Sequence, residues 1–489
     1  MTENTRKPTI IQALIPVIVL ITLLSLNVYF FGDDTLSGAN QIALLLAAAS
    51  GGVIAVLLGH NWYDVRKQIV RSIGSAMPSI MILLLIGSLA GTWLLSGVVP
   101  AMIYYGLQLL NPSIFLIACV IISALVSVAT GSSWSTVATI GIALLGIGNA
   151  IGFNDGIVAG AIISGAYFGD KMSPLSDTTN LAPAMAGTDI FTHIRYMTLT
   201  TGPSILITLI IFTVIGLSFS PAGDASGIQA TLDAIESSFY ITPVLFLVPV
   251  ALVTIIISKV PPLPSLLAGT LLGALFAVIF QPEVVSQVSG IPDSYTEASY
   301  IAIMKSMFGR ISIITSDAQV NDLLSTGGMA GMLNTIWLIM TAMIFGGVME
   351  AAGMLVRITS GLMRFAHSTG SLVATTVSTC LFFNVTASDQ YISIVVPGRM
   401  FAKTYRDRGL KPEVLSRTLE DSGTVTSVLI PWNTCGATQS AVLGVPTISY
   451  LPYAFFNLIS PFMSIFMASF NIKIRRLTDE EKAEDSQDD

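Results

Sequence analysis

Long apolar segments separated by short polar ones dominate the chain. Eight of them are uninterrupted, at residues 11–31, 41–59, 73–97, 196–219, 239–258, 262–280, 332–355 and 447–470. Each is about as long as a helix that crosses a bilayer, which needs roughly 17 to 25 residues. Two further apolar segments, 156–188 and 413–446, contain a polar interruption. The pattern predicts an all-α polytopic membrane protein with about ten spans, two of which are broken.

Segments 112–150 and 369–400 are apolar but are divided by polar clusters. Basic residues flank 369–400 at both ends, among them Arg364 and Arg399. Basic loops stay in the cytoplasm, and about 30 residues are few for two full spans. We therefore predict a re-entrant hairpin with its tip near residues 384–389, and count 112–150 as a second hairpin. A pair of short full crossings at 369–400, giving about 12 spans, is the alternative.

The charge pattern also orients the chain. Lys and Arg gather at 6–7, 66–71, 259 and 473–476, whereas the long connection 281–331 is poor in them. The positive-inside rule places the basic groups in the cytoplasm. We therefore expect cytoplasmic N- and C-termini in the inner cell membrane, Asp33 and Asp34 outside, and a disordered acidic tail.

Composition excludes most soluble functions. The 489 residues are 53% hydrophobic and only 10% charged, whereas a soluble domain carries about 25% charged residues. The basic residues are scattered, so nothing favours nucleic-acid binding. Cys119, Cys380 and Cys435 have no metal-ligand spacing. We expect the lipid bilayer as surroundings and no cofactor, and the sequence leaves a homodimer open.

The stretch GDKMSPLSDTTNLAP, residues 169–183, interrupts the first broken segment. Pro174 lacks an amide donor and disfavours helix at Ser173, so a helix arriving from Gly156 should unwind there. A bilayer tolerates broken backbone only where protein or a watery cavity surrounds it. Oxygen ligands suit a hard cation. We predict a cation site with the ligands Ser173, Ser176, Asp177, Thr178 and Asn180. The alternative is a polar loop in water.

The two halves of the chain align when one is shifted by 257 residues. Pro174 then falls on Pro431, and Gly187 falls on Gly444. Loops without charge in the first half match basic loops in the second, which indicates inverted repeats with a site between them near the midplane. The predicted organisation is a two-span region (1–72), repeat 1 (73–219), linking spans (220–331), repeat 2 (332–470) and the tail (471–489).

Four polar interruptions should therefore converge, at 130–136, 173–180, 384–389 and 420–438. The second half would add the cation ligands Asn384, Ser388, Asp389, Asn433 and Thr434. A carboxylate removed from water favours its protonated form, whereas a bound cation favours the ionised form. Na⁺ and H⁺ would therefore compete, which is the minimum that antiport requires. The candidate proton carriers are Asp177, Asp389, Asp170, Glu420 and Asp421, with Asp177 first. Substrate-binding candidates are Ser132, Ser133, Thr136 and Thr438.

Several other polar residues have simpler interpretations. Asp170 neighbours Lys171, so two interpretations of Asp170 are equally favoured: it carries the proton, or it forms a structural ion pair with Lys171. His60, His193 and His367 are expected to be solvated at membrane edges. The breaks contain no nucleophile with a base and no metal set, so we do not expect an enzyme.

The breaks resemble the NhaC family of sodium/proton antiporters, within the ion transporter superfamily. The resemblance rests on GAYFGDKMSPLSDTTNLAP, NVTASDQYISIVVPGRMF, EDSGTVTSVLIPWNTCGATQS and ATGSSWSTVATIGIALLGIG. It implies a sodium-coupled carrier whose transport region moves relative to a scaffold. Similar sequences also carry organic acids or amino acids. Exchange of Na⁺ for H⁺ is the first hypothesis. The alternative is a Na⁺- or H⁺-coupled carrier of a small carboxylate (malate/lactate exchange) or an amino acid. The absence of arginine from the breaks favours the first, because carboxylate ligands recruit Arg.

Overall fold

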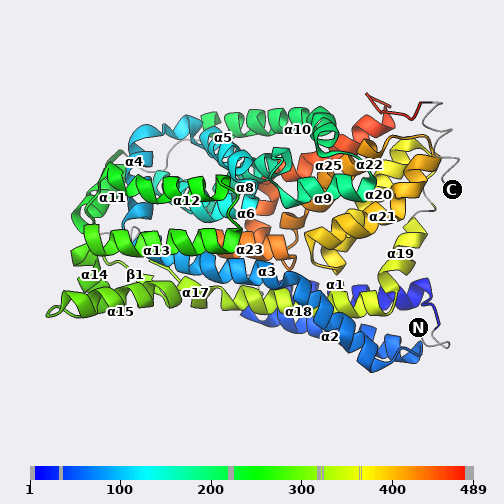
Figure 1. Cartoon of the computed structure of the whole chain (residues 1–489), viewed down its shortest axis with the longest axis horizontal. Helices are drawn as coiled ribbons and strands as arrows, with labels where there is room; N and C mark the ends of the chain where they lie inside the picture. Colours follow the sequence, from blue (N-terminus) through cyan, green and yellow to red (C-terminus); the bar gives the residue numbers. More distant parts are fainter. Residues whose placement is uncertain are drawn as a thin grey trace.

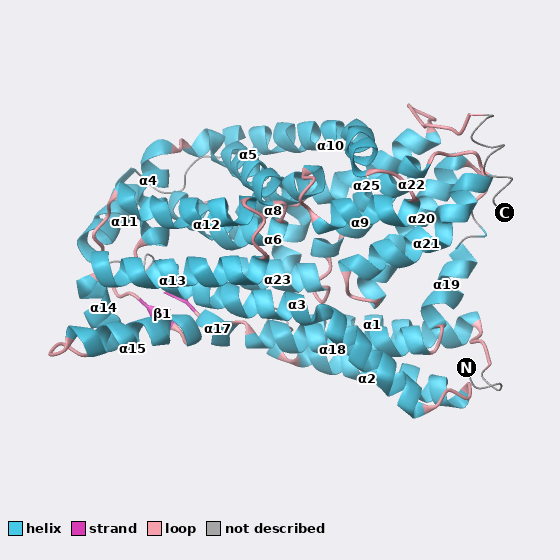
Figure 2. Ribbon diagram, in the orientation of Figure 1, coloured by secondary structure: helices cyan, strands magenta, loops and turns pink. Residues whose placement is uncertain are grey.

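Helices form nearly the whole of the protein (Figure 2). The computed structural model describes residues 6–31, 37–218, 225–315, 321, 324–362, 364 and 366–478. Asp33, Asp34 and the acidic residues 479–489, for which we made predictions, lie outside this part. Within it, the strands β1 (Ile311–Ser312) and β2 (Ser325–Thr326) pair antiparallel, with Ile311 opposite Thr326.

Eight helices of the described chain are long and apolar enough to cross a membrane, or up to ten if each bent pair forms one span. This confirms the all-α polytopic prediction. The segment predicted at 239–258 forms a helix over Pro243–Ile257 that lies at 87° to the preceding helix Gln229–Ser238, and the segment predicted at 447–470 is bent by 55°. The span predicted at 73–97 belongs to a longer helix, because the Asn61 side chain caps an α-helix that continues to Leu95.

The first layer of the structure contains α1, α2, α3, α13 and α18, which run along the long axis in the lower part of Figure 1. Helix α18 packs along both α2 and α3, and α13 packs along the other side of α3. Close approach to α15 explains Gly91, since a Cβ there would lie 1.8 Å from the Ser306 carbonyl oxygen. The elements of this layer and its connections are α1 (Ile10–Phe31), α2 (Ala39–Leu57), α3 (Trp62–Leu95), α4 (Val98–Leu109), α11 (Ala225–Ser238), η3 (Pro243–Phe246), α12 (Leu247–Ile257), α13 (Pro262–Phe280), α14 (Pro282–Ser289), α15 (Tyr295–Phe308), α17 (Gly328–Gly331), α18 (Leu333–Ala351) and α19 (Met354–Leu362).

The second layer contains the interrupted helices. Both predicted breaks are present: α8 ends at Ser173, which is extended at ψ 127°, and the second broken helix ends before Asn433. The elements are α5 (Pro112–Thr130), α6 (Ser133–Thr136), the π-helical turn η2 (Val137–Gly141), α7 (Ile142–Ile151), α8 (Asp155–Met172), α9 (Asp177–Ala186), α10 (Ile190–Ser218), α20 (Thr369–Thr386), α21 (Gln390–Asp407), α22 (Pro412–Leu419), the π-helical turn η5 (Glu420–Thr424), the 3₁₀ turn η6 (Ser427–Leu429), α23 (Thr434–Leu443), α24 (Thr447–Tyr450), η7 (Leu451–Tyr453) and α25 (Phe455–Ser469).

Element boundaries in this layer recur at the spacing of 257 residues that the sequence suggested. Helix α5 starts at 112 and α20 at 369, α8 at 155 and α22 at 412, and α9 at 177 and α23 at 434. Even the hairpin tips match, because Gly131 and Ser388 both have left-handed backbone, with φ of 69° and 59°. Helix α4, which leads into the first hairpin, lies at the left end of Figure 1, and α19, which leads into the second, lies at the right end. The opposite orientation of the two sets stays a prediction.

Candidate functional site

A cavity of about 810 Å³ lies between the two layers. One wall comes from α3, at Ser75 to Ile82, and from the turn between α12 and α13. The other wall comes from the first hairpin tip, at Thr130 to Ser135, from the break at 174–178, and from the start of α21. Two of the predicted polar interruptions, 130–136 and 173–180, therefore line this cavity. A third, 384–389, is followed directly by the lining residues Gln390 and Tyr391.

Asp177 lies on the cavity wall, as the first residue of α9. It is exposed and makes no hydrogen bond with another described residue. Two of the predicted fellow ligands bind the backbone instead, since Ser173 Oγ donates to the Val128 carbonyl (2.8 Å) and Asn180 Nδ2 donates to the Ser176 carbonyl (2.7 Å). The other two, Ser176 and Thr178, line the cavity beside Asp177. The oxygens freed by the break thus stabilise the break itself. The cation site at this break stays a prediction.

Asp170 lies at the buried end of the same cavity, where its side chain is 8% exposed. Its Oδ2 accepts hydrogen bonds from Ser133 N (3.0 Å) and Ser133 Oγ (2.7 Å). Ser132 caps α6 by accepting from Ser135 N, and Thr136 Oγ1 donates to the Ser132 carbonyl at 2.9 Å. The first hairpin tip therefore binds the α8 carboxylate directly.

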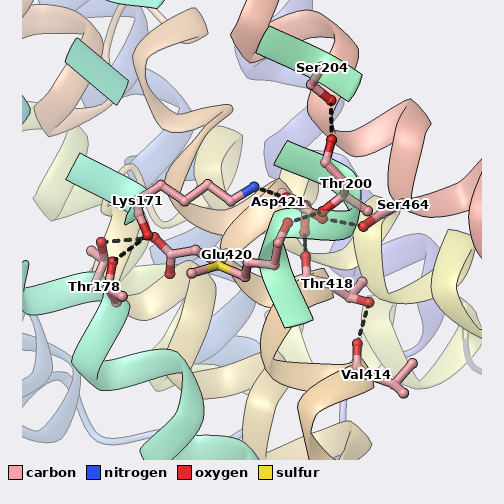
Figure 3. A network of polar contacts seen from close by, with 12 residues as sticks. Lys171, Thr178, Thr200, Ser204, Val414, Thr418, Glu420, Asp421 and Ser464 are labelled. Atoms are coloured by element: carbon pink, nitrogen blue, oxygen red, sulfur yellow. Dashed lines mark hydrogen bonds and ion pairs between the residues drawn. The ribbon is translucent and has the colours of Figure 1, made fainter. Parts of the chain in front are cut away.

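Lys171 pairs with a residue of the other broken helix rather than with its neighbour Asp170. Its Nζ forms an ion pair with Asp421 Oδ1 of η5, and both side chains are 0% exposed (Figure 3). The other oxygen of Asp421 accepts a hydrogen bond from Ser464 Oγ of α25. Successive residues of a helix point about 100° apart, so Asp170 faces α6 while Lys171 faces η5 and α25. Of the two alternatives left open for Asp170, the ion pair with Lys171 is therefore not formed.

Glu420 precedes Asp421 in the same π-helical turn and is also fully buried. Thr178 Oγ1 of α9 donates to its Oε1 at 3.1 Å, and its Oε2 has no hydrogen-bond partner among the described residues (Figure 3). Single π-helical turns occur frequently at functional sites. Buried charges destabilise a fold unless they are paired, and ionisable groups within a membrane are rare and functional. We call Asp170, Lys171, Glu420 and Asp421 the buried charge layer.

The second hairpin tip meets the second break, as predicted. Asn384 Nδ2 donates to the Gly423 carbonyl (2.8 Å), Asn433 Nδ2 donates to Asn384 Oδ1 (3.2 Å), and the Thr434 amide donates to the Ser388 carbonyl (2.9 Å). Asp389 caps α21 by accepting from the Tyr391 and Ile392 amides. The Asp389 carboxylate therefore already stabilises the N-terminus of α21.

Two buried hydroxyls near this second tip have no hydrogen-bond partner in the described chain. They belong to Ser388 at the tip and to Thr438 on α23. Both were predicted on sequence grounds, as a cation ligand and as a substrate ligand. Both hydroxyls therefore keep unused hydrogen-bonding capacity within the described residues.

Two buried residues escaped the sequence-based reasoning. Arg417 of α22 is 0% exposed, its three guanidinium nitrogens have no hydrogen-bond partner within the described residues, and it stacks at 4.4 Å over the Tyr196 ring. His193 was expected in solvent but is 0% exposed, with Nδ1 2.8 Å from Ser416 Oγ. The signal for Arg417 was its position inside an apolar segment. For His193 there was none, because only the packing of α10 on α22 buries it.

The chain also resembles known proteins over most of its length. A model of the Na⁺/H⁺ antiporter family matches residues 165–472. The Na⁺/H⁺ antiporter NhaC of Alkalihalophilus pseudofirmus is 38% identical over 433 residues, covering 88% of this chain and 90% of that protein. The malate-2H⁺/Na⁺-lactate antiporter of Bacillus subtilis is 35% identical over 94% of both chains. The arginine/ornithine antiporter ArcD of Halobacterium salinarum is 35% identical over 99% of this chain and 96% of that protein. The protein therefore belongs to the Na⁺/H⁺ antiporter family, as the broken-helix motifs predicted.

Proposed function

We propose that this protein is a secondary active transporter that exchanges Na⁺ for H⁺ across the membrane. The buried charge layer carries the proposal. Asp170 comes from the first broken helix and Glu420 and Asp421 from the second, and Asp170 lines the cavity. A cavity lined by the buried carboxylate of Asp170 gives a cation a route to a group that also binds protons. Transport without covalent chemistry fits the membership of an antiporter family.

Competition at this layer would couple the two ions. With all four groups ionised, three carboxylates face one ammonium group, so the layer carries a net negative charge. Low dielectric surroundings make that charge unfavourable. Either a proton on Glu420 or Asp170, or a Na⁺ arriving through the cavity past Asp177, would reduce it. Binding of one ion thereby weakens binding of the other.

The second hairpin tip is our candidate for a further cation site. Asn384, Ser388, Asn433 and Thr434 meet there, and the Ser388 hydroxyl has no partner among described residues. Carbonyl, amide and hydroxyl oxygens suit a hard cation. Asp389, which caps a helix, serves here by orienting the tip rather than by carrying the proton.

The two sets of helices would be inverted repeats with the basic end of the protein in the cytoplasm. The two hairpins start from opposite ends of the molecule, while both termini lie at one end (Figure 1). Lys259 and the turn that follows line the cavity mouth. With that basic turn in the cytoplasm, the cavity faces inward. Exchange then requires the broken helices to move relative to α3, α13 and α18.

Purified protein in proteoliposomes tests the exchange directly. An inward Na⁺ gradient should alkalinise the lumen of vesicles that contain no organic solute. A pH-sensitive dye trapped in the lumen would report the change, and empty liposomes give the leak. Absence of any Na⁺-driven pH change under these conditions would contradict the proposal.

The second candidate is a Na⁺- or H⁺-coupled carrier of a small carboxylate or an amino acid. The cavity favours it, because about 810 Å³ falls within the roughly 300–1,000 Å³ that small-molecule sites occupy. Two relatives, each 35% identical to this chain, are named for organic substrates. Adding malate, lactate or an amino acid to the same vesicles separates the candidates. A strict requirement for one of these solutes would replace the first proposal by the second.

A further inference from the structure

A second cavity, of about 550 Å³, lies on the other side of the first layer, between α2, α3 and α18. Its walls are formed by apolar side chains, including Ala49, Gly52 and Val53 of α2, Trp62 and Ile69 of α3, and Val348 of α18. Val53 and Trp62 are 61% and 56% exposed, so this groove is open on the outer face of the protein. It shares no lining residue with the cavity that reaches the buried charge layer.

The groove arises from the packing of three helices. Helices α2 and α3 each pack along α18 but contact one another little. The residues of α2 that line the space between α2 and α3 include the small Ala48, Ala49 and Gly52, which do not fill it. The result is a channel open to one side, with α18 as its floor, on a surface that faces hydrocarbon if α2 and α3 span the bilayer.

One end of the groove is basic. Trp62 and Ile69 both line it, and Arg66 lies on the same face of α3, at spacings of four and three residues from them. The Arg66 guanidinium lies 5.1 Å from the Tyr63 ring, and Arg66 is exposed. A backbone hydrogen bond from Arg6 N to the Leu58 carbonyl, 2.9 Å long, holds the N-terminal segment against the end of α2.

This hydrogen bond brings further charge to the same end. Arg6, Lys7, Arg66 and Lys67 are all exposed, and Asp64 is the one acid in the described stretches 6–7 and 58–67. An aromatic ring such as Trp62 is typical of the level of the lipid headgroups. An apolar channel with a Trp and four cations at its mouth matches the chemistry of a lipid with a negative headgroup.

We propose that the groove binds one anionic phospholipid, with an acyl chain along α18 and the phosphate beside Arg66 and Lys67. The charge at the mouth selects this occupant over a helix from a second copy, which would bring the same four cations to the interface. The site is separate from ion exchange and does not depend on it.

Native mass spectrometry of the purified full-length protein tests the site, with phosphatidylglycerol and phosphatidylcholine of identical acyl chains as probes. Phosphatidylglycerol should bind at least tenfold more tightly. Arg66→Gln with Lys67→Gln should remove most of that preference. The matched control, Arg195→Gln with Arg399→Gln, removes two exposed cations elsewhere and should change nothing.

A second pair of variants tests the apolar part. Ala49→Phe fills the groove and should reduce phosphatidylglycerol binding at least tenfold, whereas Leu46→Phe, on the same helix but outside the groove, should not. Equal binding of the two lipids, or full binding by Ala49→Phe, overturns the proposal. So does a shift from dimer to monomer caused by Ala49→Phe without loss of lipid binding, because a second copy would then occupy the groove.

Discussion

The two units of broken helices, α5–α9 and α20–α23, have the same backbone plan and different chemistry. Their helices start at matching positions, and each break is followed by a capped ten-residue helix that ends at a left-handed glycine, Gly187 or Gly444. In the first unit the break lines the cavity and Asp177 is exposed. In the second unit, Asn433 and Thr434 at the break are buried.

The charged residues are not repeated between the units. Asp170 and Lys171 correspond to Ser427 and Val428, and Glu420 and Asp421 correspond to Ile163 and Ser164. Each unit therefore supplies charges that the other lacks, and the charges meet where the units touch. The repeat determines where the backbone is interrupted, whereas the differences between its copies create the buried charge layer.

Opposite orientation of the two units predicts an all-or-none contrast in labelling. We expect cysteines introduced as His367→Cys and Asp407→Cys to react with impermeant thiol reagents from the cytoplasm only. Leu109→Cys, close to the matching position of the first unit, should react from outside only. The measurement uses a background without Cys119, Cys380 and Cys435. Labelling of all three positions from one side would show that the units are parallel.

The ion pair between the units should give the largest effect on stability. Lys171→Met or Asp421→Asn alone leaves a buried charge unpaired, which costs about 3–5 kcal/mol. The double variant should regain most of this loss. Thermal unfolding in detergent measures it.

The partly exposed pair of Arg475 with Glu413 provides the control. Breaking it with Arg475→Gln should cost less than either single variant of the buried pair, because Arg475 is 48% exposed, although Glu413 is only 5% exposed. A double variant at Lys171 and Asp421 that is no more stable than either single variant would refute the assignment of this pair as the contact between the units.

The hairpin tips differ in how they accommodate left-handed backbone. Gly131→Ala should destabilise the protein by about 1–3 kcal/mol, because its φ is +69° and a Cβ would lie 2.6 Å from Leu175 Cβ. Ser388→Gly should change stability by less than about 1 kcal/mol, since glycine relieves the strain at the second tip. Urea titration of both variants checks the difference. Equal losses of stability in Gly131→Ala and Ser388→Gly would mean that the two tips are not equivalent backbone positions.

Asp177 should show the smallest effect on stability. Because it is exposed and has no hydrogen-bond partner among described residues, Asp177→Asn should alter stability by less than about 0.5 kcal/mol. We expect a severalfold weaker apparent affinity for Na⁺, with coupled exchange retained at saturating Na⁺. Initial rates of exchange against Na⁺ concentration measure this. Complete loss of exchange at every Na⁺ concentration would return the proton-carrying role to Asp177.

The sequence predicts the breaks well and the contacts across them poorly. Pro174, Pro431 and the capping residues Ser176 and Asn433 act locally, so their effect on the backbone is visible in the chain itself. The partner of Lys171 is not, because it lies 250 residues away and depends on how α8 packs against η5 and α25. The exposure of Asp177 could not be predicted either, because it too depends on how distant elements pack around the cavity.

The central claim, that the buried charge layer couples Na⁺ to H⁺, is tested most directly with the double variant Asp170→Asn, Glu420→Gln, which removes the two carboxylates proposed to exchange the ions. The amide oxygens can still accept the hydrogen bonds from Ser133 and Thr178, and the Lys171–Asp421 pair is kept, so the variant should fold and insert into the membrane. In proteoliposomes with an inward Na⁺ gradient and no organic solute, we expect at least a hundredfold slower alkalinisation than for the native protein. Exchange at the native rate by the folded double variant would contradict the account.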